Sequence, residues 1–167
     1  MIEIAKNLIR FIVLILLQVI VFNNIDISIF LNPIIIVLFI ISLPFNTPKW
    51  VLLVSAFLLG LIIDLFLNTP GILSFTAVFI AYARPFLLSI LQPREGYFIG
   101  ATPSIADLGW SWYFQFSIIN TVAFHLLYFL ILGVSQENFL IILWKTIISS
   151  LFTLVIIFLF QLFSIKK

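Results

Sequence analysis

Long apolar runs, separated by short polar stretches, make up most of this chain. A helix needs about 20 mostly apolar residues to cross the hydrocarbon core of a bilayer, which is roughly 30 Å thick. Runs of this kind occupy residues 8–22, 25–43, 50–67, 71–91, 110–133 and 139–165. The pattern therefore predicts about six transmembrane helices.

The second run is the least regular. Asp26, Ser28, Asn32 and Pro33 interrupt its first half, and the uninterrupted apolar part covers residues 34–43. Pro33 lies near the start of that part, where a helix tolerates a residue without an N–H group. We therefore expect a re-entrant or broken helix here.

Charge favours an even number of spans. Lys and Arg collect on the cytoplasmic flanks of membrane helices. With six spans and a cytoplasmic N-terminus, the outside loops hold the acidic Asp26 and Glu137. The cytoplasmic flanks then hold Lys6, Arg10, Lys49, Arg84, Arg94, Lys166 and Lys167. We expect both termini in the cytoplasm. The first run is expected to be retained, since no small-residue cleavage pattern follows it.

The composition indicates that most of the protein surface faces lipid. Hydrophobic residues make up 64% of the 167 residues and charged residues 8%, whereas a soluble domain has about a quarter charged residues. The chain has no cysteine, which excludes disulfides and thiolate metal sites. Its net charge of +2 is small and scattered, so nucleic acid is not an expected partner. No linker divides it, and we expect one multi-pass domain over residues 1–167.

The longest connection, residues 92–109, carries signs of a short interfacial helix. Thr102 and Pro103 are suited to its start and Gly109 to its end. Trp110, Trp112 and Tyr113 follow, where an aromatic belt is expected.

The third and fourth runs form the most informative stretch. Asn68 or Thr69 is suited to cap the fourth helix, with Pro70 in its first turn, so a tight hairpin is expected. Small residues spaced three or four apart share a helical face with Asp64 and with Arg84. These residues are Ala56 and Gly60 in the third run, and Ser74, Ala77 and Ala81 in the fourth. Because helices in lipid pack through small residues, both faces are expected to point inward.

Ionisable residues inside the other spans are also candidates for a site. His125 continues a helical face with Ser111 and Gln115, and Lys145 lies at a similar expected depth to His125 and Asp64. Asp64 and Lys145 either extend to the head groups or form an inward ion pair, because unpaired charges in lipid are costly. A proton or ligand site at this level is the third interpretation. Arg84 either extends to the inner interface or binds helix ends and lipid phosphates.

No catalytic motif is evident. The sequence has no Walker loop, paired-carboxylate motif, histidine-rich cluster or nucleophile elbow. We therefore expect no enzyme activity, no catalytic residue, no cofactor and no metal site.

Three short motifs in the third and fourth runs suggest a family. They are Gly60-Leu-Ile-Ile-Asp64, Asn68-Thr-Pro-Gly71 and Ala81-Tyr-Ala-Arg-Pro85. This stretch resembles the MreD family of rod shape-determining membrane proteins. The rest of the chain agrees with that family in size and hydropathy.

The resemblance implies a role in bacterial cell elongation in the inner membrane. Members act beside the bitopic protein MreC, near the actin-like MreB and the peptidoglycan synthases. Their fold is similar to that of the substrate-binding subunits of energy-coupling-factor transporters. The positions carried over as family-typical are Gly60, Asp64, Pro70, Gly71 and Arg84.

Two hypotheses of function follow. The first is a non-enzymatic scaffold or regulator of the rod complex, which supports peptidoglycan synthesis by docking a partner's span in the membrane. The alternative is a small-molecule-binding transmembrane subunit of a transporter, with its pocket at the level of Asp64, His125 and Lys145. Surrounding lipids are expected contacts in both.

Overall fold

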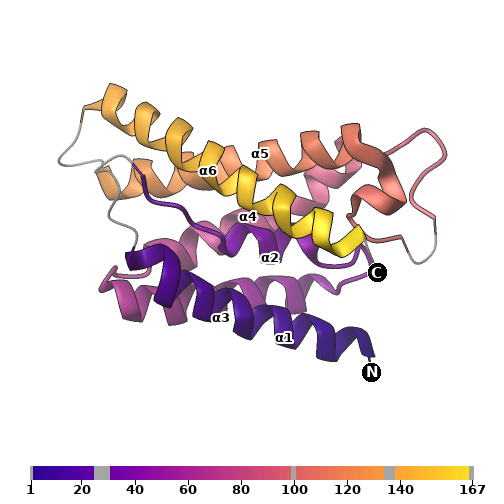
Figure 1. Ribbon diagram of the computed structural model, residues 1–167, viewed down its shortest axis with the longest axis horizontal. Coiled ribbons are helices and arrows are strands. Elements are labelled where there is room, and N and C mark those ends of the chain that lie inside the picture. Colours follow the sequence, from indigo (N-terminus) through magenta and orange to yellow (C-terminus); the bar gives the residue numbers. More distant parts are fainter. Residues whose placement is uncertain (1, 25–30, 99–100, 134–137, 166–167) are drawn as a thin grey trace.

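The computed structural model describes residues 2–24, 31–98, 101–133 and 138–165 (Figure 1). These residues contain helices and connections but no strand, as the predicted all-α class requires. In chain order the elements are α1 (Ile2–Leu16), the π-helical turn η1 (Leu17–Val21), the 3₁₀ turn η2 (Phe22–Asn24), α2 (Ile36–Ser42), α3 (Lys49–Leu67), α4 (Ile72–Ile90), α5 (Ile105–Gly133) and α6 (Phe139–Ile165).

Four of these helices are long and apolar enough to cross a membrane. They are α3, α4, α5 and α6, and they make the chain a multi-pass membrane protein. The first two expected spans differ from them: α1 ends after 15 residues and continues as η1 and η2, and α2 has 7 residues. The four long helices do not confirm the expected six spans.

Consecutive helices run in opposite directions along the long axis of the molecule (Figure 1). The start of α1 and the end of α6 lie at the same end (Figure 1), which fits an even number of passes. We call this the basic end, because Lys6, Arg10, Lys49 and Arg94 lie on the elements and loops that meet there. The opposite end, which carries the turn between α3 and α4, is the hairpin end.

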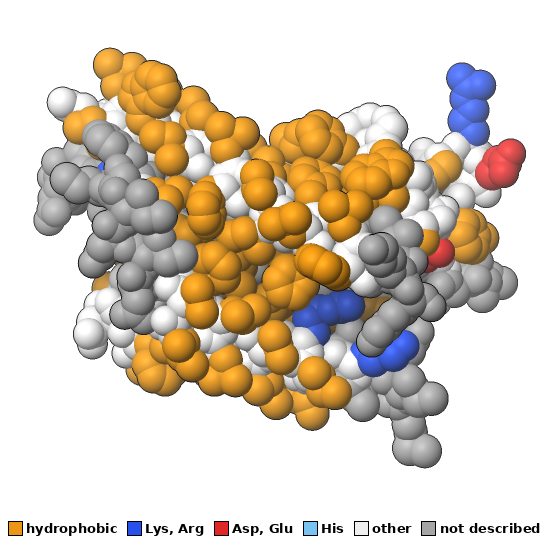
Figure 2. Space-filling view, viewed as in Figure 1, with side chains coloured by type: hydrophobic (Ala, Val, Ile, Leu, Met, Phe, Trp, Pro, Cys, Tyr) orange, Lys and Arg blue, Asp and Glu red, His pale blue; other side chains and the backbone are white. Residues whose placement is uncertain are grey.

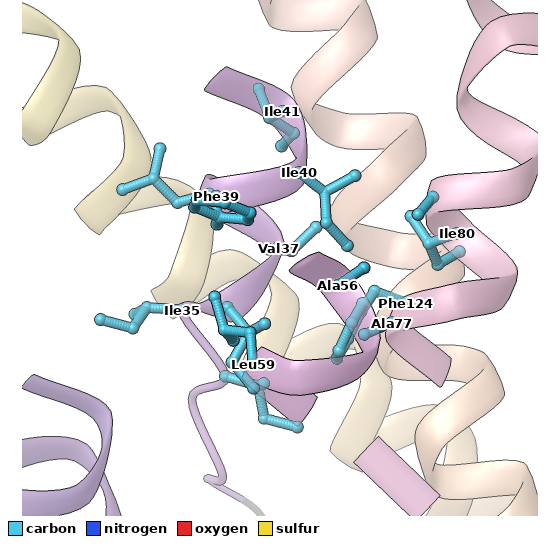
Figure 3. Packing of buried hydrophobic residues seen from close by; sticks show 14 of the residues in the cluster. Ile35, Val37, Phe39, Ile40, Ile41, Ala56, Leu59, Ala77, Ile80 and Phe124 are labelled. Carbon is cyan, nitrogen blue, oxygen red and sulfur yellow. The ribbon is translucent and has the colours of Figure 1, made fainter. Parts of the chain in front are cut away.

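The short helix α2 lies at the centre of the bundle and contacts α1, α3, α4 and α5. All side chains from Ile34 to Ile41 are buried. They pack against Ala56, Leu59, Ala77, Ile80 and Phe124 of the surrounding helices (Figure 3). A helix that is apolar on every side belongs in such an interior. In the described part of the second run, residues 31–43, non-helical backbone therefore leads into a short helix enclosed by protein, as the interrupted pattern predicted.

The residues before α2 are non-helical and need other hydrogen-bond partners. Non-helical backbone at membrane depth is tolerated where protein groups satisfy it. The amide of Gln18, which is 2% exposed, accepts a bond from Ile35 N at 2.8 Å and donates to Pro33 O at 3.1 Å. Ser149 Oγ of α6 accepts a bond from Asn32 N at 3.0 Å. Side chains of η1 and α6 thus provide hydrogen bonds that these backbone groups would otherwise form within a helix.

The expected interfacial helix is present as the first turn of α5. It begins at Ile105, and Gly109, with φ 81° and ψ 168°, breaks it from the long part of α5. The capping residue is Ser104 and not Thr102, since Ser104 Oγ accepts a bond from Asp107 N at 3.2 Å. The Asp107 carboxylate in turn accepts bonds from Thr102 N and Thr102 Oγ1.

A first prediction concerns Gln18. Gln18→Leu should lower the free energy of unfolding in detergent micelles by roughly 2–3 kcal/mol, because it leaves Ile35 N and Pro33 O buried without partners. The matched control is Gln115→Leu, since Gln115 is exposed and donates to Ser111 on its own helix. Equal stability of the two variants in a denaturant titration would contradict the role given to Gln18.

Candidate functional site

Asp64 joins the two helices of the hairpin. Its carboxylate, on a residue that is 3% exposed, accepts bonds from Leu73 N at 3.0 Å, Ser74 N at 2.8 Å and Ser74 Oγ at 2.7 Å. Thr69 Oγ1 donates a further bond to it. The first N–H groups of a helix have no partner within that helix, and they attract negative charge. Asp64 therefore acts as the N-cap of α4 from a position on α3.

The backbone of Asp64 also closes its own helix. Its carbonyl accepts bonds from Asn68 N and from Thr69 N, the latter at 3.1 Å. Asn68 has φ 54°, a left-handed conformation that often ends helices. One residue thus ends α3 through its carbonyl and begins α4 through its side chain.

The close approach of α3 and α4 depends on Gly60. A Cβ atom placed there would lie 2.5 Å from Ser74 Cα and 2.7 Å from Ser74 N, which leaves no room for a side chain. Small residues at helix contacts in lipid allow this approach. Gly60 therefore brings Ser74 within reach of the Asp64 carboxylate.

The two predicted packing faces of the hairpin are observed. Gly60 and the other small residues of both faces are buried, together with Asp64 and Arg84. The buried small residues are Ala56, Ser74, Ala77 and Ala81. Asp64 therefore does not extend toward the head groups.

The predicted caps of the hairpin turn were wrong. Asn68 ends α3 and does not cap α4, and Pro70 lies before the first turn of α4. The N-cap position is Gly71, whose φ of 78° would strain any other residue type. Local spacing suggested Asn68 or Thr69, but Asp64 reaches the same N–H groups from the neighbouring helix.

Arg84 lies near the other end of the hairpin and binds the end of α2. Its guanidinium, on a residue that is 2% exposed, donates to the carbonyl of Leu43. Arg10 of α1 donates to the adjacent carbonyl of Ser42 at 3.0 Å. Positive charge is favourable at a helix C-terminus, where carbonyls lack partners. Of the alternatives predicted for Arg84, binding to a helix end is the one observed.

His125 lies between α5 and α6 and is fully buried. Its Nδ1 atom is 2.9 Å from Thr121 O, and its Nε2 atom is 3.3 Å from Thr153 Oγ1 of α6. The expected polar face with Ser111 and Gln115 does not point inward with it, since both are exposed. His125 therefore connects two helices.

The hydrogen bonds that Asp64 and His125 form with described residues do not join these two side chains to each other. The described partners of Asp64 lie in the hairpin, those of His125 lie on α5 and α6, and Lys145 is half-buried on α6. Within the described ranges, no three His, Cys, Asp or Glu residues are grouped as metal ligands.

Helices α5 and α6 carry further buried polar residues that were not predicted from the sequence. Ser117, Asn120 and Thr121 on α5 are buried, as are Thr146 and Ser150 on α6. Thr146 Oγ1 donates to Ile142 O at 2.8 Å and Asn120 Nδ2 to Phe116 O at 2.7 Å, both one turn back. In the sequence, Ser117 and Thr121 are four residues apart, as are Thr146 and Ser150, so each pair shares a helical face. Gln18 was also missed, although it stands alone in an apolar run.

An aromatic cluster closes the basic end. Tyr97 stacks on Phe45 with centroids 4.4 Å apart, and Trp112 packs edge-on against Tyr97 at 5.9 Å. Tyr97 Oη donates to Leu88 O and Trp112 Nε1 to Leu91 O. Burial raises the pKa of Tyr97 in this loop. Of the residues expected in a belt, Trp110 is exposed as predicted, but Tyr113 is 1% exposed and lies in the core.

Three clefts on the surface of the described residues are large enough to consider as binding sites. One of about 400 Å³ lies between α3 and α4 and includes Leu53, Ala81 and Tyr82 in its lining. A second, of about 330 Å³, lies between α1 and α3 and is almost entirely apolar. A third, of about 200 Å³, lies at the basic end and is polar.

Comparisons with protein-family models, curated proteins and solved structures each found no match to this chain.

A second prediction concerns Asp64. Asp64→Ala should lower the free energy of unfolding by roughly 3 kcal/mol, because Leu73 N and Ser74 N lose their buried acceptor. Asp64→Asn keeps one acceptor oxygen and should lose about half as much. Both are measured by denaturant titration in mixed micelles.

The control for Asp64 is Glu95→Ala, which removes an exposed carboxylate from the loop after α4. It should change stability by less than about 0.5 kcal/mol. An Asp64→Ala variant as stable as Glu95→Ala would refute the capping role.

Proposed function

We propose that this protein is a non-enzymatic membrane scaffold of the bacterial cell-elongation complex. In this proposal it lies in the inner membrane, with the basic end in the cytoplasm, and maintains cell shape by supporting peptidoglycan synthesis. The proposal rests on the structural role of the residues that carry the MreD resemblance. Gly60, Asp64, Gly71 and Arg84 fix the α3–α4 hairpin and its contact with α2.

This use of polar groups favours docking over chemistry. The carboxylate of Asp64 accepts bonds from backbone and hydroxyl groups of the hairpin, and Arg84 binds a backbone carbonyl. These bonds make the hairpin a rigid platform and orient its outer face toward lipid. A rigid apolar face suits the binding of another membrane helix.

The proposed partner is the single span of an MreC-type protein, bound in the cleft between α3 and α4. Buried Ala81 is part of the lining of this cleft, as are Tyr82 and Phe86, which are 74% and 70% exposed. A small residue between large ones admits a side chain from a neighbouring helix. Lys49 lines the cleft at the basic end, where it can reach the head groups.

Further partners follow from the same resemblance. The actin-like MreB would lie on the cytoplasmic side, and the peptidoglycan synthases would share the membrane. The positive-inside tendency of Lys6, Arg10, Lys49 and Arg94 supports placing the basic end in the cytoplasm.

The alternative, a small-molecule-binding subunit of a transporter, has less support. Under this alternative, Asp64, His125 and Lys145 should line a pocket. The three clefts described above are lined by other residues. We therefore retain the scaffold as the proposed function.

A third prediction concerns cell shape. Depletion of the protein from a rod-shaped host should give round cells, and the tagged protein should copurify with an MreC-type partner. Wild type and Glu95→Ala should restore rods, whereas Asp64→Ala should restore them poorly because the hairpin is weakened. Cells that keep a normal width after depletion would contradict the proposal.

A fourth prediction locates the partner. The chain has no cysteine, so single cysteines can be placed at Leu53, Tyr82 and Phe86 in the cleft. Matched controls are Leu151 and Val155 on the exposed face of α6. Cysteines scanned along the partner's span should crosslink to the cleft positions with a helical period and not to α6. Equal crosslinking at the α6 positions would exclude this docking surface. So would the finding that lipid, and not the partner's helix, contacts Tyr82.

A further inference from the structure

The polar cleft at the basic end has two cationic side chains in its wall. Lys6 and Arg10 of α1 line it, one helical turn apart and therefore on the same face. Arg10 is held in place by its bond to Ser42 O at 3.0 Å, whereas Lys6 is exposed. Figure 2 shows basic side chains in a hollow of the otherwise apolar face, toward the start of α1.

The remaining polar groups of the wall are neutral. Thr102 and Ser104 come from the loop before α5, and Gln161 comes from α6. Asp107 is not part of the lining, and its carboxylate is occupied by Thr102 N at 2.8 Å and Thr102 Oγ1 at 2.6 Å. The described lining therefore contains positive charge and neutral hydrogen-bonding groups but no carboxylate.

The level of the cleft indicates which anions can reach it. Trp50 and Trp110, 69% and 55% exposed, follow the loops of the same end. Exposed tryptophans mark the head-group level of a membrane protein. The volume of about 200 Å³ equals that of roughly seven liquid water molecules, which is room for a phosphate group and part of its alcohol.

We propose that this cleft binds the phosphate of an anionic phospholipid in the leaflet at the basic end. Arg10 presents a guanidinium whose orientation Ser42 fixes, and a planar guanidinium suits phosphate oxygens. Exposed Lys6 adds a second positive charge, and the Ser104 hydroxyl group and the Gln161 amide can donate further hydrogen bonds. Bound lipid would hold α1 against the loop before α5 and against α6.

The test uses the full-length protein in nonionic detergent, with phosphatidylglycerol, phosphatidylcholine or inorganic phosphate as added ligand. Binding is followed by native mass spectrometry and by the shift in melting temperature. Phosphatidylglycerol should bind and raise the melting temperature of the wild type. Phosphatidylcholine and inorganic phosphate should do so far less, because the first lacks net charge and the second lacks a membrane anchor.

Lys6→Gln identifies the site, since Lys6 is exposed and its loss should leave the fold intact. It should weaken phosphatidylglycerol binding about fivefold, as expected for one cation at a membrane surface. The matched control is Arg94→Gln, which removes one exposed charge from the same end outside the cleft. This control should change affinity less than twofold.

Each other outcome overturns the proposal. Equal weakening by Lys6→Gln and Arg94→Gln would mean diffuse attraction to the basic end. An equal melting shift with inorganic phosphate would assign the cleft to a soluble anion, and equal binding of phosphatidylcholine would remove the role of charge. Absence of phosphatidylglycerol binding would exclude a lipid site.

Discussion

A bilayer offers no hydrogen bonds to a helix that ends inside it, and the structure depends on meeting this constraint. The short helix α2 begins and ends within the bundle, so its terminal groups need protein partners. Gln18 satisfies Ile35 N and Pro33 O before it, and Arg10 and Arg84 bind the carbonyls of Ser42 and Leu43 at its end. Asp64 does the same for the start of α4.

The same constraint explains why the ionisable residues of the interior are structural. A buried polar group in lipid is costly unless it is hydrogen-bonded. Asp64 and Arg84 are bonded to backbone groups, and His125 connects α5 to Thr153 of α6. With these residues committed to the fold, the outer faces of the helices become the surfaces for partners. The proposed scaffold function uses the cleft between α3 and α4 in this way.

The two proposed binding sites differ in chemistry because they lie at different levels. The cleft between α3 and α4 is mostly apolar and combines Ala81 with projecting aromatic residues, so it suits a helix. The cleft beside Lys6 and Arg10 is polar and lies near exposed tryptophans, so it suits a phosphate head group. Lipid at the second site would brace α1, which is shorter and carries more charge than the four long helices.

The sequence by itself indicated that lipid surrounds most of the chain and that the fold is helical. It also indicated the broken second run and the inward faces that contain Asp64 and Arg84. These features follow from composition and from the helical repeat, which states which residues share a face. Only the tertiary structure decided what those faces meet: α4 N–H groups for Asp64, the Leu43 carbonyl for Arg84 and Thr153 for His125. Periodicity carries no information about which helices become neighbours, or at what height they pack. Partners contributed by another helix, such as Ser149 for Asn32, therefore could not be predicted.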